Sequence, residues 1–160
     1  MNTELKDEGL YEVALKEVRM DNADINKVLD LLTKAHALGD ARATYALATW
    51  YLHGHNVLMD MDKAISFLRK ADKRGIAPAS YDLAVCYEKG MGVKKSRARA
   101  IQLYTKAALL GDRPSIYEVG RCIYFGFGVS RDKKYGMMWI DLARRFGVVE
   151  DEDHGCHPRP

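Results

Sequence analysis

The chain has 160 residues, of which 48% are hydrophobic and 29% are charged, with a formal net charge of +3 at neutral pH. This is the composition of a soluble globular domain, which excludes a disordered or membrane-embedded chain, and the length suits a single domain with a useful core. No apolar run approaches the roughly 20 residues of a membrane helix, so we expect no membrane partner.

The N-terminal segment MNTELKDEGLYEV lacks a basic stretch followed by an apolar one. It therefore does not resemble a secretory signal, and we expect a cytoplasmic protein. The three cysteines, an odd number without paired spacing, favour a reducing compartment. Only four prolines occur, and two of them are among the last three residues, so the rest of the chain can be mostly helical.

The sequence repeats itself with a period of 36 residues. One series of equivalent positions is glycine throughout, another is alanine, and a third holds good helix N-caps. These series are Gly39, Gly75, Gly111 and Gly147; Ala35, Ala71, Ala107 and Ala143; and Asp24, Asp60, Ser96 and Asp132. Four-member series in independent columns predict a repeat protein.

We expect residues 1–147 to form one repeat domain and residues 148–160 an acidic flexible tail. The repeat domain begins with a degenerate unit at 3–39, in which Val18 and Met20 replace the glycines of later turns. A unit with only one neighbour can depart from the repeat in this way. The regular repeats that follow are 41–75, 77–111 and 113–147.

The apolar spacing within each repeat predicts two antiparallel helices of about 12 to 14 residues. In one of them, the capping Asp60 is followed by an apolar face between Ala64 and Ala71, and the helix stops at Gly75, which can take a left-handed conformation. The other helix is expected to begin four residues later, at Ala79, and to end at Gly90.

The segment EKGMGVKKS, residues 88–96, has the glycines and lysines of a phosphate-binding loop. However, Gly90 and Gly92 recur as Gly126 and Gly128, and the lysines do not recur with them. A catalytic phosphate loop would be needed once, and this segment lacks the remainder of a P-loop pattern. We interpret it as a turn between helices.

The stretch ASYDLAVCYEKGMGVKKSRARAIQLYTKAALLG resembles the Sel1-like repeat, an α/α repeat related to tetratricopeptide repeats, and the repeats on either side of it are similar. The resemblance implies an all-α fold: a right-handed α/α superhelical solenoid of about four helix-turn-helix repeats. It further implies that the first helix of each pair lines a concave face, and that the usual role is to bind protein. Some secreted relatives bridge the two helices of a unit with cysteines.

Cys86 and Cys122 stand one repeat apart, with no cysteine in the helix paired to either. Stacked helices lie about 8–10 Å apart, whereas the Cα atoms of a disulfide lie within about 7 Å. We therefore expect free thiols.

Residue types that carry chemistry are present but scattered. His53 and His55 flank a turn glycine, and His154, Cys156 and His157 lie in the tail without a fourth ligand for a closed zinc site. No nucleophile–base arrangement and no paired carboxylates stand out. We expect no catalytic residue, no metal site and no cofactor, and hence a protein that is not an enzyme.

The outward positions of the first helices are the candidate partner-binding face, because they vary from repeat to repeat while the core columns do not. These positions are Arg42, Thr49, Trp50, His53, Asp82, Val85, Lys89, Glu118, Arg121 and Phe125, and the same spacing also includes Ala46, Cys86 and Cys122. Trp50 and Phe125 are the type of large aromatic residue that anchors interfaces. The alternative is that either one packs between helices.

Charge is distributed unevenly: residues 66–147 contain 17 Lys/Arg against 7 Asp/Glu, whereas residues 1–65 contain 7 against 11. The candidate basic surface consists of Lys94, Lys95, Arg97, Arg99, Arg113, Arg131, Lys133 and Lys134. It could attract an acidic protein surface, bind nucleic acid, contact the chain's own tail, or simply be solvated. Nucleic acid is less favoured, because the cations cluster around turns.

We therefore expect a scaffold that binds a specific protein partner. The family resemblance includes short relatives that act as immunity proteins and neutralise a bacterial toxin by occluding it. An adaptor or regulator in a signalling complex, and a nucleic-acid-binding module using the basic half 66–147, remain the alternatives.

Overall fold

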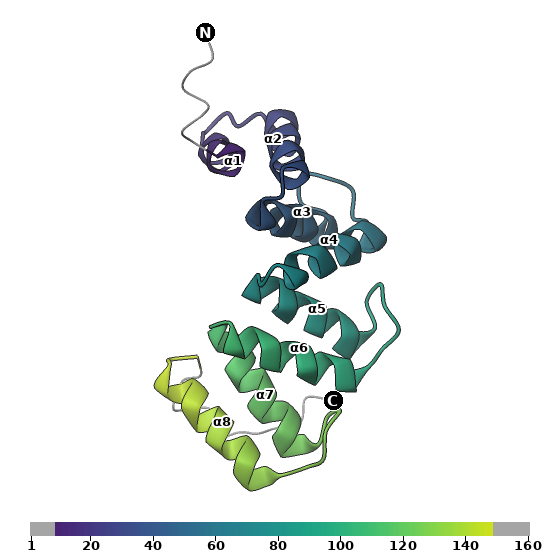
Figure 1. The fold of residues 1–160 in the computed structure, drawn as a ribbon, viewed down its shortest axis with the longest axis vertical. Coiled ribbons are helices and arrows are strands. Elements are labelled where there is room, and N and C mark those ends of the chain that lie inside the picture. The colour runs from purple at the N-terminus through teal and green to yellow at the C-terminus, as the bar shows by residue number, and fades with distance from the viewer. Residues whose placement is uncertain (1–8, 149–160) are drawn as a thin grey trace. The chain divides into compact units, whose positions relative to one another are not determined.

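A computed structural model describes residues 9–148. Over this range the chain forms eight α-helices and no strand (Figure 1). The helices are α1 (Leu10–Val18), α2 (Ile25–Ala37), α3 (Ala41–His53), α4 (Met61–Lys73), α5 (Ala77–Lys89), α6 (Arg97–Leu109), α7 (Arg113–Phe125) and α8 (Lys133–Arg145). The predicted all-α repeat fold is confirmed. Seven helices have 13 residues, within the expected range, whereas α1 has nine.

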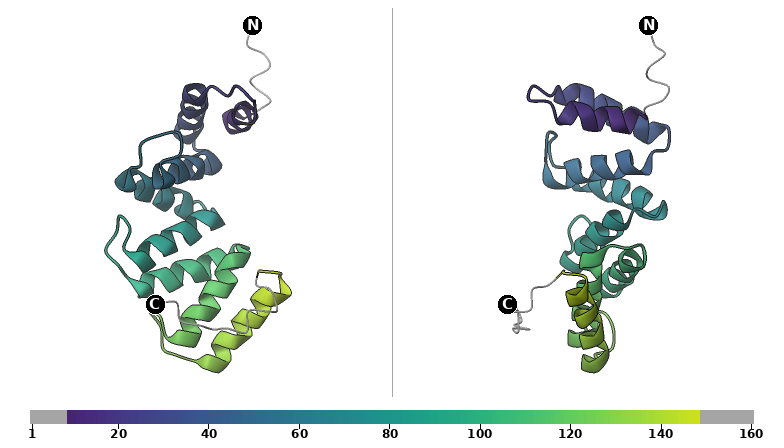
Figure 2. Two further views of the ribbon diagram at one scale, coloured as in Figure 1. Left: turned by 180° about the vertical axis from the view of Figure 1, so that it is seen from behind. Right: turned by 90° about the vertical axis from the view of Figure 1, so that its left-hand side faces the viewer.

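The chain divides into two compact units, residues 1–79 and residues 80–160. In the first unit α1 packs on α2 and α3 packs on α4, and in the second α7 packs on both α6 and α8 (Figure 2). The predicted tail lies outside the described residues from position 149 onward.

The predicted N-caps begin the second helix of each pair. The side chains of Asp24, Asp60, Ser96 and Asp132 accept hydrogen bonds from backbone N–H groups in the first turns of α2, α4, α6 and α8. Each cap satisfies a donor that the helix itself leaves unpaired. The start of α5 differs from the prediction: it begins at Ala77, two residues before Ala79. Proline at position 78 is compatible with this, because a first-turn residue needs no intrahelical N–H donor.

The glycine-rich segment 90–96 is a turn between α5 and α6, as interpreted from the repeat. Gly90 and Gly92 have φ of +79° and +65°, and the backbone N–H of Ser96 donates to the carbonyl of Tyr87 at 2.8 Å. The equivalent glycines of the next repeat, Gly126 and Gly128, also have positive φ. The glycines therefore serve the backbone conformation of a repeated turn.

The core of each unit is built from small and aliphatic side chains on facing helices. In the first unit Ala14, Val28, Leu32, Ala35, Ala43 and Leu47 form one buried cluster. In the second, α7 and α8 approach most closely where Gly120 and Gly136 replace alanines of earlier repeats. A Cβ atom on Gly136 would lie 2.6 Å from the backbone nitrogen of Tyr124, so only glycine fits.

Candidate functional site

The candidate partner-binding residues are divided between the two units. Those on α3 belong to the first unit: Arg42 and His53 are exposed, while Thr49 and Trp50 are half-buried. Those on α5 and α7 belong to the second unit: Lys89 is exposed, while Asp82, Val85, Glu118, Arg121 and Phe125 are half-buried.

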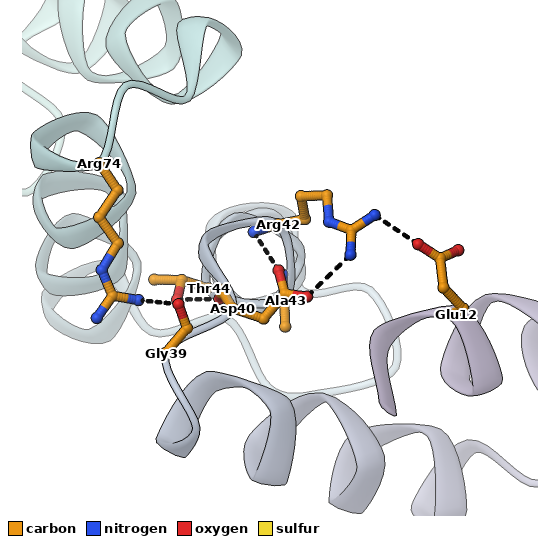
Figure 3. A network of polar contacts seen from close by, with 7 residues as sticks. All are labelled: Glu12, Gly39, Asp40, Arg42, Ala43, Thr44 and Arg74. Carbon is orange, nitrogen blue, oxygen red and sulfur yellow. Dashed lines mark hydrogen bonds and ion pairs between the residues drawn. The ribbon is translucent and has the colours of Figure 1, made fainter. Parts of the chain in front are cut away.

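In the first unit the side chain of Arg42 connects α1 to the N-terminal end of α3 (Figure 3). Its Nη1 donates to Glu12 Oε1 of α1 at 2.5 Å, its Nη2 donates to Asp40 Oδ2 at 3.0 Å, and its guanidinium lies 4.6 Å from the ring of Tyr11. Asp40 also caps α3 by accepting from the backbone of Arg42 and Ala43. Because the Arg42–Glu12 pair is well exposed, water screens it, and it positions the side chain more than it stabilises the fold.

The rest of the α3 candidates contribute less to an exposed surface. Trp50 packs against the core cluster of the first unit, as the alternative interpretation of that residue foresaw. Thr49 donates from Oγ1 to the carbonyl of Ala46 at 2.8 Å. The rings of His53 and His55 are tilted by 31° to each other, with centroids 5.5 Å apart. The described part of the chain brings no third metal-ligating residue to them.

In the second unit Arg121 is the centre of a four-residue polar chain. Its Nε donates to Glu118 Oε2 at 2.6 Å on its own helix, and its Nη2 donates to Glu88 Oε1 on α5 at 2.7 Å. The other Glu88 oxygen accepts from the hydroxyl of Tyr104 on α6 at 2.8 Å. The chain Tyr104–Glu88–Arg121–Glu118 therefore joins α5, α6 and α7.

The protonation states of this chain are fixed by its partners. Burial alone would raise the pKa of Glu88, but the hydrogen bonds from Arg121 and Tyr104 outweigh burial and hold the pKa below its usual value. Burial opposes the charged form of Arg121, yet Glu88 and Glu118 raise its pKa. Burial, followed by the charge of Glu88, raises the pKa of Tyr104. Near neutral pH, Arg121 is therefore a fixed cation and Glu88 a fixed anion.

Arg121 also belongs to a group of three aromatic rings and two guanidiniums. This group is here called the Phe127 cluster and consists of Arg97, Arg121, Tyr124, Phe125 and Phe127. The guanidiniums of Arg97 and Arg121 lie 4.8 Å and 5.5 Å from the Phe127 ring. The Phe125 and Phe127 rings stack with centroids 5.5 Å apart, and Tyr124 meets Phe125 edge to face at 4.9 Å. The three rings are half-buried, so each keeps part of its surface open to a partner.

The turn that carries Phe127 is fixed against α6. A Cβ atom on Gly128 would lie 2.3 Å from the carbonyl carbon of Arg97, so the backbones of the turn and of α6 are in close contact. This contact, together with the Arg97 guanidinium, sets the position of the Phe127 ring. The cluster is thus held by backbone packing as well as by side chains.

Sequence reasoning did not identify Glu88, Tyr104 or Phe127 as part of this site. For Phe127 a signal was available, because the position between the two turn glycines varies as Met91 and Phe127 in the last two repeats. For Glu88 there was none, since its partner Arg121 lies 33 residues away in the sequence. Two expectations for the surface are wrong: Cys86 and Cys122 are buried, not outward-facing.

The two cysteines are buried because the core-facing sectors of α5 and α7 are wide enough to include them, each lying next to other buried residues. Both thiols are free, as expected. Burial raises the pKa of Cys86 to about 11 and that of Cys122 to about 12. Both thiols are therefore protonated and shielded at neutral pH.

All eight residues of the candidate basic surface are exposed and belong to the second unit. Several of them lie over rings: Arg97 over Phe127, Arg99 over Tyr87, Arg113 over Phe146, and Lys133 over Tyr124. Arg131 donates from Nε to the carbonyl of Tyr124 at 3.3 Å. Residues 80–148 contain 13 Lys/Arg against 6 Asp/Glu, a net charge of +7.

No helix of the described chain is long and apolar enough to cross a membrane.

Comparison with known proteins gives a consistent result. The family model of the Sel1 repeat matches residues 41–75, 77–112 and 113–145. No curated protein matches the sequence.

Among solved structures, the chain is similar to a protective antigen of uropathogenic Escherichia coli with an SLR fold: TM-score 0.82, 26% identity, 86% of this chain and 30% of that one. It is similar to a Sel1 repeat protein of Oxalobacter formigenes: TM-score 0.78, 31% identity, 86% of this chain and 40% of that one. It is also similar to cysteine rich protein B of Helicobacter pylori: TM-score 0.61, 27% identity, 84% and 95%. The chain thus spans less than half the length of the first two proteins.

Proposed function

Because the chain belongs to the Sel1 repeat family, we propose that it is a non-enzymatic scaffold that binds a specific protein partner. Sel1 repeats are generally protein–protein interaction scaffolds and typically lack enzymatic activity. The observation that carries the proposal for this chain is the Phe127 cluster, where stacked aromatic rings and two guanidiniums share one partly open surface.

The composition of the cluster suits an interface. Arginine and aromatic residues are enriched at interface cores and dominate binding energy when they are truncated. Arg121 is already immobilised by Glu88 and Glu118, and Phe127 by the close approach of Gly128 to α6. A surface that is ordered before binding loses less side-chain entropy when the partner arrives.

The charge of the second unit indicates the kind of partner. A net charge of +7 over residues 80–148, with all eight candidate cations exposed, favours a protein surface that carries acidic groups. Such charges accelerate encounter and disfavour basic competitors. A narrower form of the proposal is a cytoplasmic immunity protein that occludes a toxin; an adaptor in a signalling complex would use the same surface.

An affinity capture tests the proposal. The tagged full chain is incubated with nuclease-treated lysate of its source, and the eluate is read by mass spectrometry. The comparison variant is Phe125→Lys/Phe127→Met, which introduces the residues that the preceding repeat carries at these positions, Lys89 and Met91. The control is Leu109→Lys, an exposed position on α6 at which an earlier repeat has Lys73.

We expect one stoichiometric protein with wild type and with the control, and its loss with the cluster variant. The identity of that protein distinguishes a toxin from a signalling component. Retention by the cluster variant would contradict the site, and recovery of nucleic acid alone from an untreated lysate would contradict protein binding.

A further inference from the structure

The last helix, α8, presents a stripe of apolar side chains to solvent. Tyr135, Met138, Leu142 and Phe146 are 48%, 60%, 39% and 45% exposed. They follow one another at spacings of three or four residues, which places them on one face of the helix and the turn after it. The buried residues of α8, Gly136, Ile140 and Ala143, occupy the neighbouring sector that packs on α7. The four exposed residues are here called the α8 stripe.

The repeat itself does not require these residues to be apolar. The four equivalent positions are Lys63, Ser66, Lys70 and Arg74 in the repeat at residues 41–75. In the repeat at residues 77–111 they are Arg99, Gln102, Lys106 and Leu110. The chain thus builds the same helix with polar residues at three or four of these positions elsewhere. A contiguous apolar strip on an otherwise charged surface marks an interaction site.

Positive charge borders the stripe. Lys134 and Arg145 lie on α8 itself, each within one helical turn of a stripe residue, and the guanidinium of Arg113 is 5.5 Å from the Phe146 ring. The acidic residue of this helix, Asp141, is already paired with Arg144 at 2.8 Å. The surroundings of the stripe are therefore apolar in the middle and cationic at the margins.

We propose that the α8 stripe is a docking site for an amphipathic helix of a partner protein, with apolar residues on one face and acidic residues beside them. An apolar face laid against an apolar strip is a common mode of helix recognition. From Tyr135 to Phe146 the stripe extends roughly 16 Å at about 1.5 Å per residue, which matches three turns of a bound helix. Acidic flanks would pair with Lys134, Arg145 and Arg113.

Two other occupants fit less well. If a second copy packed its α8 against this one in an antiparallel arrangement, Lys133 and Lys134 of each copy would face Arg144 and Arg145 of the other. In a parallel arrangement each of these cations would face its own counterpart. Positive charges would therefore repel in both arrangements. The chain's own segment 149–160 contains a single aliphatic residue, Val149, and cannot fill four apolar positions. The inference rests on the proposed function in that the ligand is a protein, but it concerns a different surface from the Phe127 cluster.

The experiment is a selection of displayed random 16-residue peptides on the immobilised full chain. Enriched peptides are synthesised and titrated against three variants. The first variant, Tyr135→Lys/Met138→Ser/Leu142→Lys, introduces the residues that the repeat at 41–75 has at these positions. The second, Tyr135→Arg/Met138→Gln, introduces those of the repeat at 77–111. Leu58→Lys, an exposed position at which the next repeat has Lys94, is the control. Circular dichroism checks the helical content of each variant.

We expect peptides with apolar residues at helical spacing and acidic flanks, whose affinity falls at least tenfold with either stripe variant and is unchanged with Leu58→Lys and with Phe125→Lys/Phe127→Met. Enrichment of no peptide, or peptides that bind the stripe variants as tightly as wild type, would overturn the inference. A wild-type dimer that becomes monomeric with a stripe variant in sedimentation would overturn it in favour of a second copy. Loss of the captured partner with the Phe127 cluster variant tests the proposed function independently.

Discussion

Arg121 of α7 donates from Nη2 to Glu88 of α5 at 2.7 Å, and both side chains are mostly withdrawn from water, at 23% and 22% exposure. The same guanidinium also lies 5.5 Å from the Phe127 ring. Arg121 therefore links α5 to α7 and also contacts the Phe127 cluster. A substitution at Arg121 would affect both the stability of the second unit and any binding, which is why the binding variants proposed above leave it unchanged.

The first prediction concerns the stability of this pair. Arg121→Met should lower the free energy of unfolding by about 1–3 kcal/mol, because it leaves Glu88 and Glu118 desolvated without their cation. Urea denaturation followed by circular dichroism measures the change. Adding Glu88→Gln should recover part of the loss, and if the double variant is no more stable than Arg121→Met, the ion pair is not the cause.

The second prediction concerns pH. The folded-state pKa of Glu88 lies below its ordinary value of 4.5, so its ion pair contributes full stability above that value and loses it as the pH falls through the folded-state pKa. Between pH 5 and pH 3, wild type should therefore lose more stability than Glu88→Gln does. Denaturation curves across this range provide the comparison, and parallel losses in the two proteins would argue against the shift.

The third prediction separates two reasons for a turn glycine. Gly111 has φ of +95° with no atom within 4 Å of an added Cβ, so Gly111→Ala should cost about 1 kcal/mol for the left-handed conformation alone. Gly128 has φ of +77° and a Cβ would lie 2.3 Å from the Arg97 carbonyl carbon. Gly128→Ala should therefore cost on the order of 2 kcal/mol or more, because backbone must move. Equal melting curves for the two variants would mean that the turn does not contact α6.

The fourth prediction concerns the buried thiols. In a Cys156→Ser chain at pH 8, iodoacetamide should label neither Cys86 nor Cys122 until urea unfolds the protein, because burial raises their pKa values to about 11 and about 12. Mass spectrometry of the labelled chain counts the modified residues. Labelling in seconds without urea would place the thiols at the surface.

The sequence predicted the repeating parts of the fold well, because a 36-residue period exposes every position that three or four units share. The caps at Asp60 and Asp132 and the turn at Gly90 are of this kind. It predicted Arg121 as a candidate but not its neighbours Glu88 and Phe127, because these residues do not repeat and meet Arg121 only after α5, α6 and α7 have packed. The prediction that Cys86 and Cys122 face outward was wrong for a related reason. Helical spacing indicates the centre of a buried face but not its width.

Coverage of the Phe127 cluster by a protein partner can be measured in solution. Hydrogen–deuterium exchange of the full chain, with and without the partner recovered by affinity capture, tests it most directly. We expect slower exchange on binding in the C-terminal half of α7 and the turn that follows, residues 119–131, with exchange in α2 unchanged. Unaltered exchange over residues 119–131, with protection confined to other helices, would contradict it.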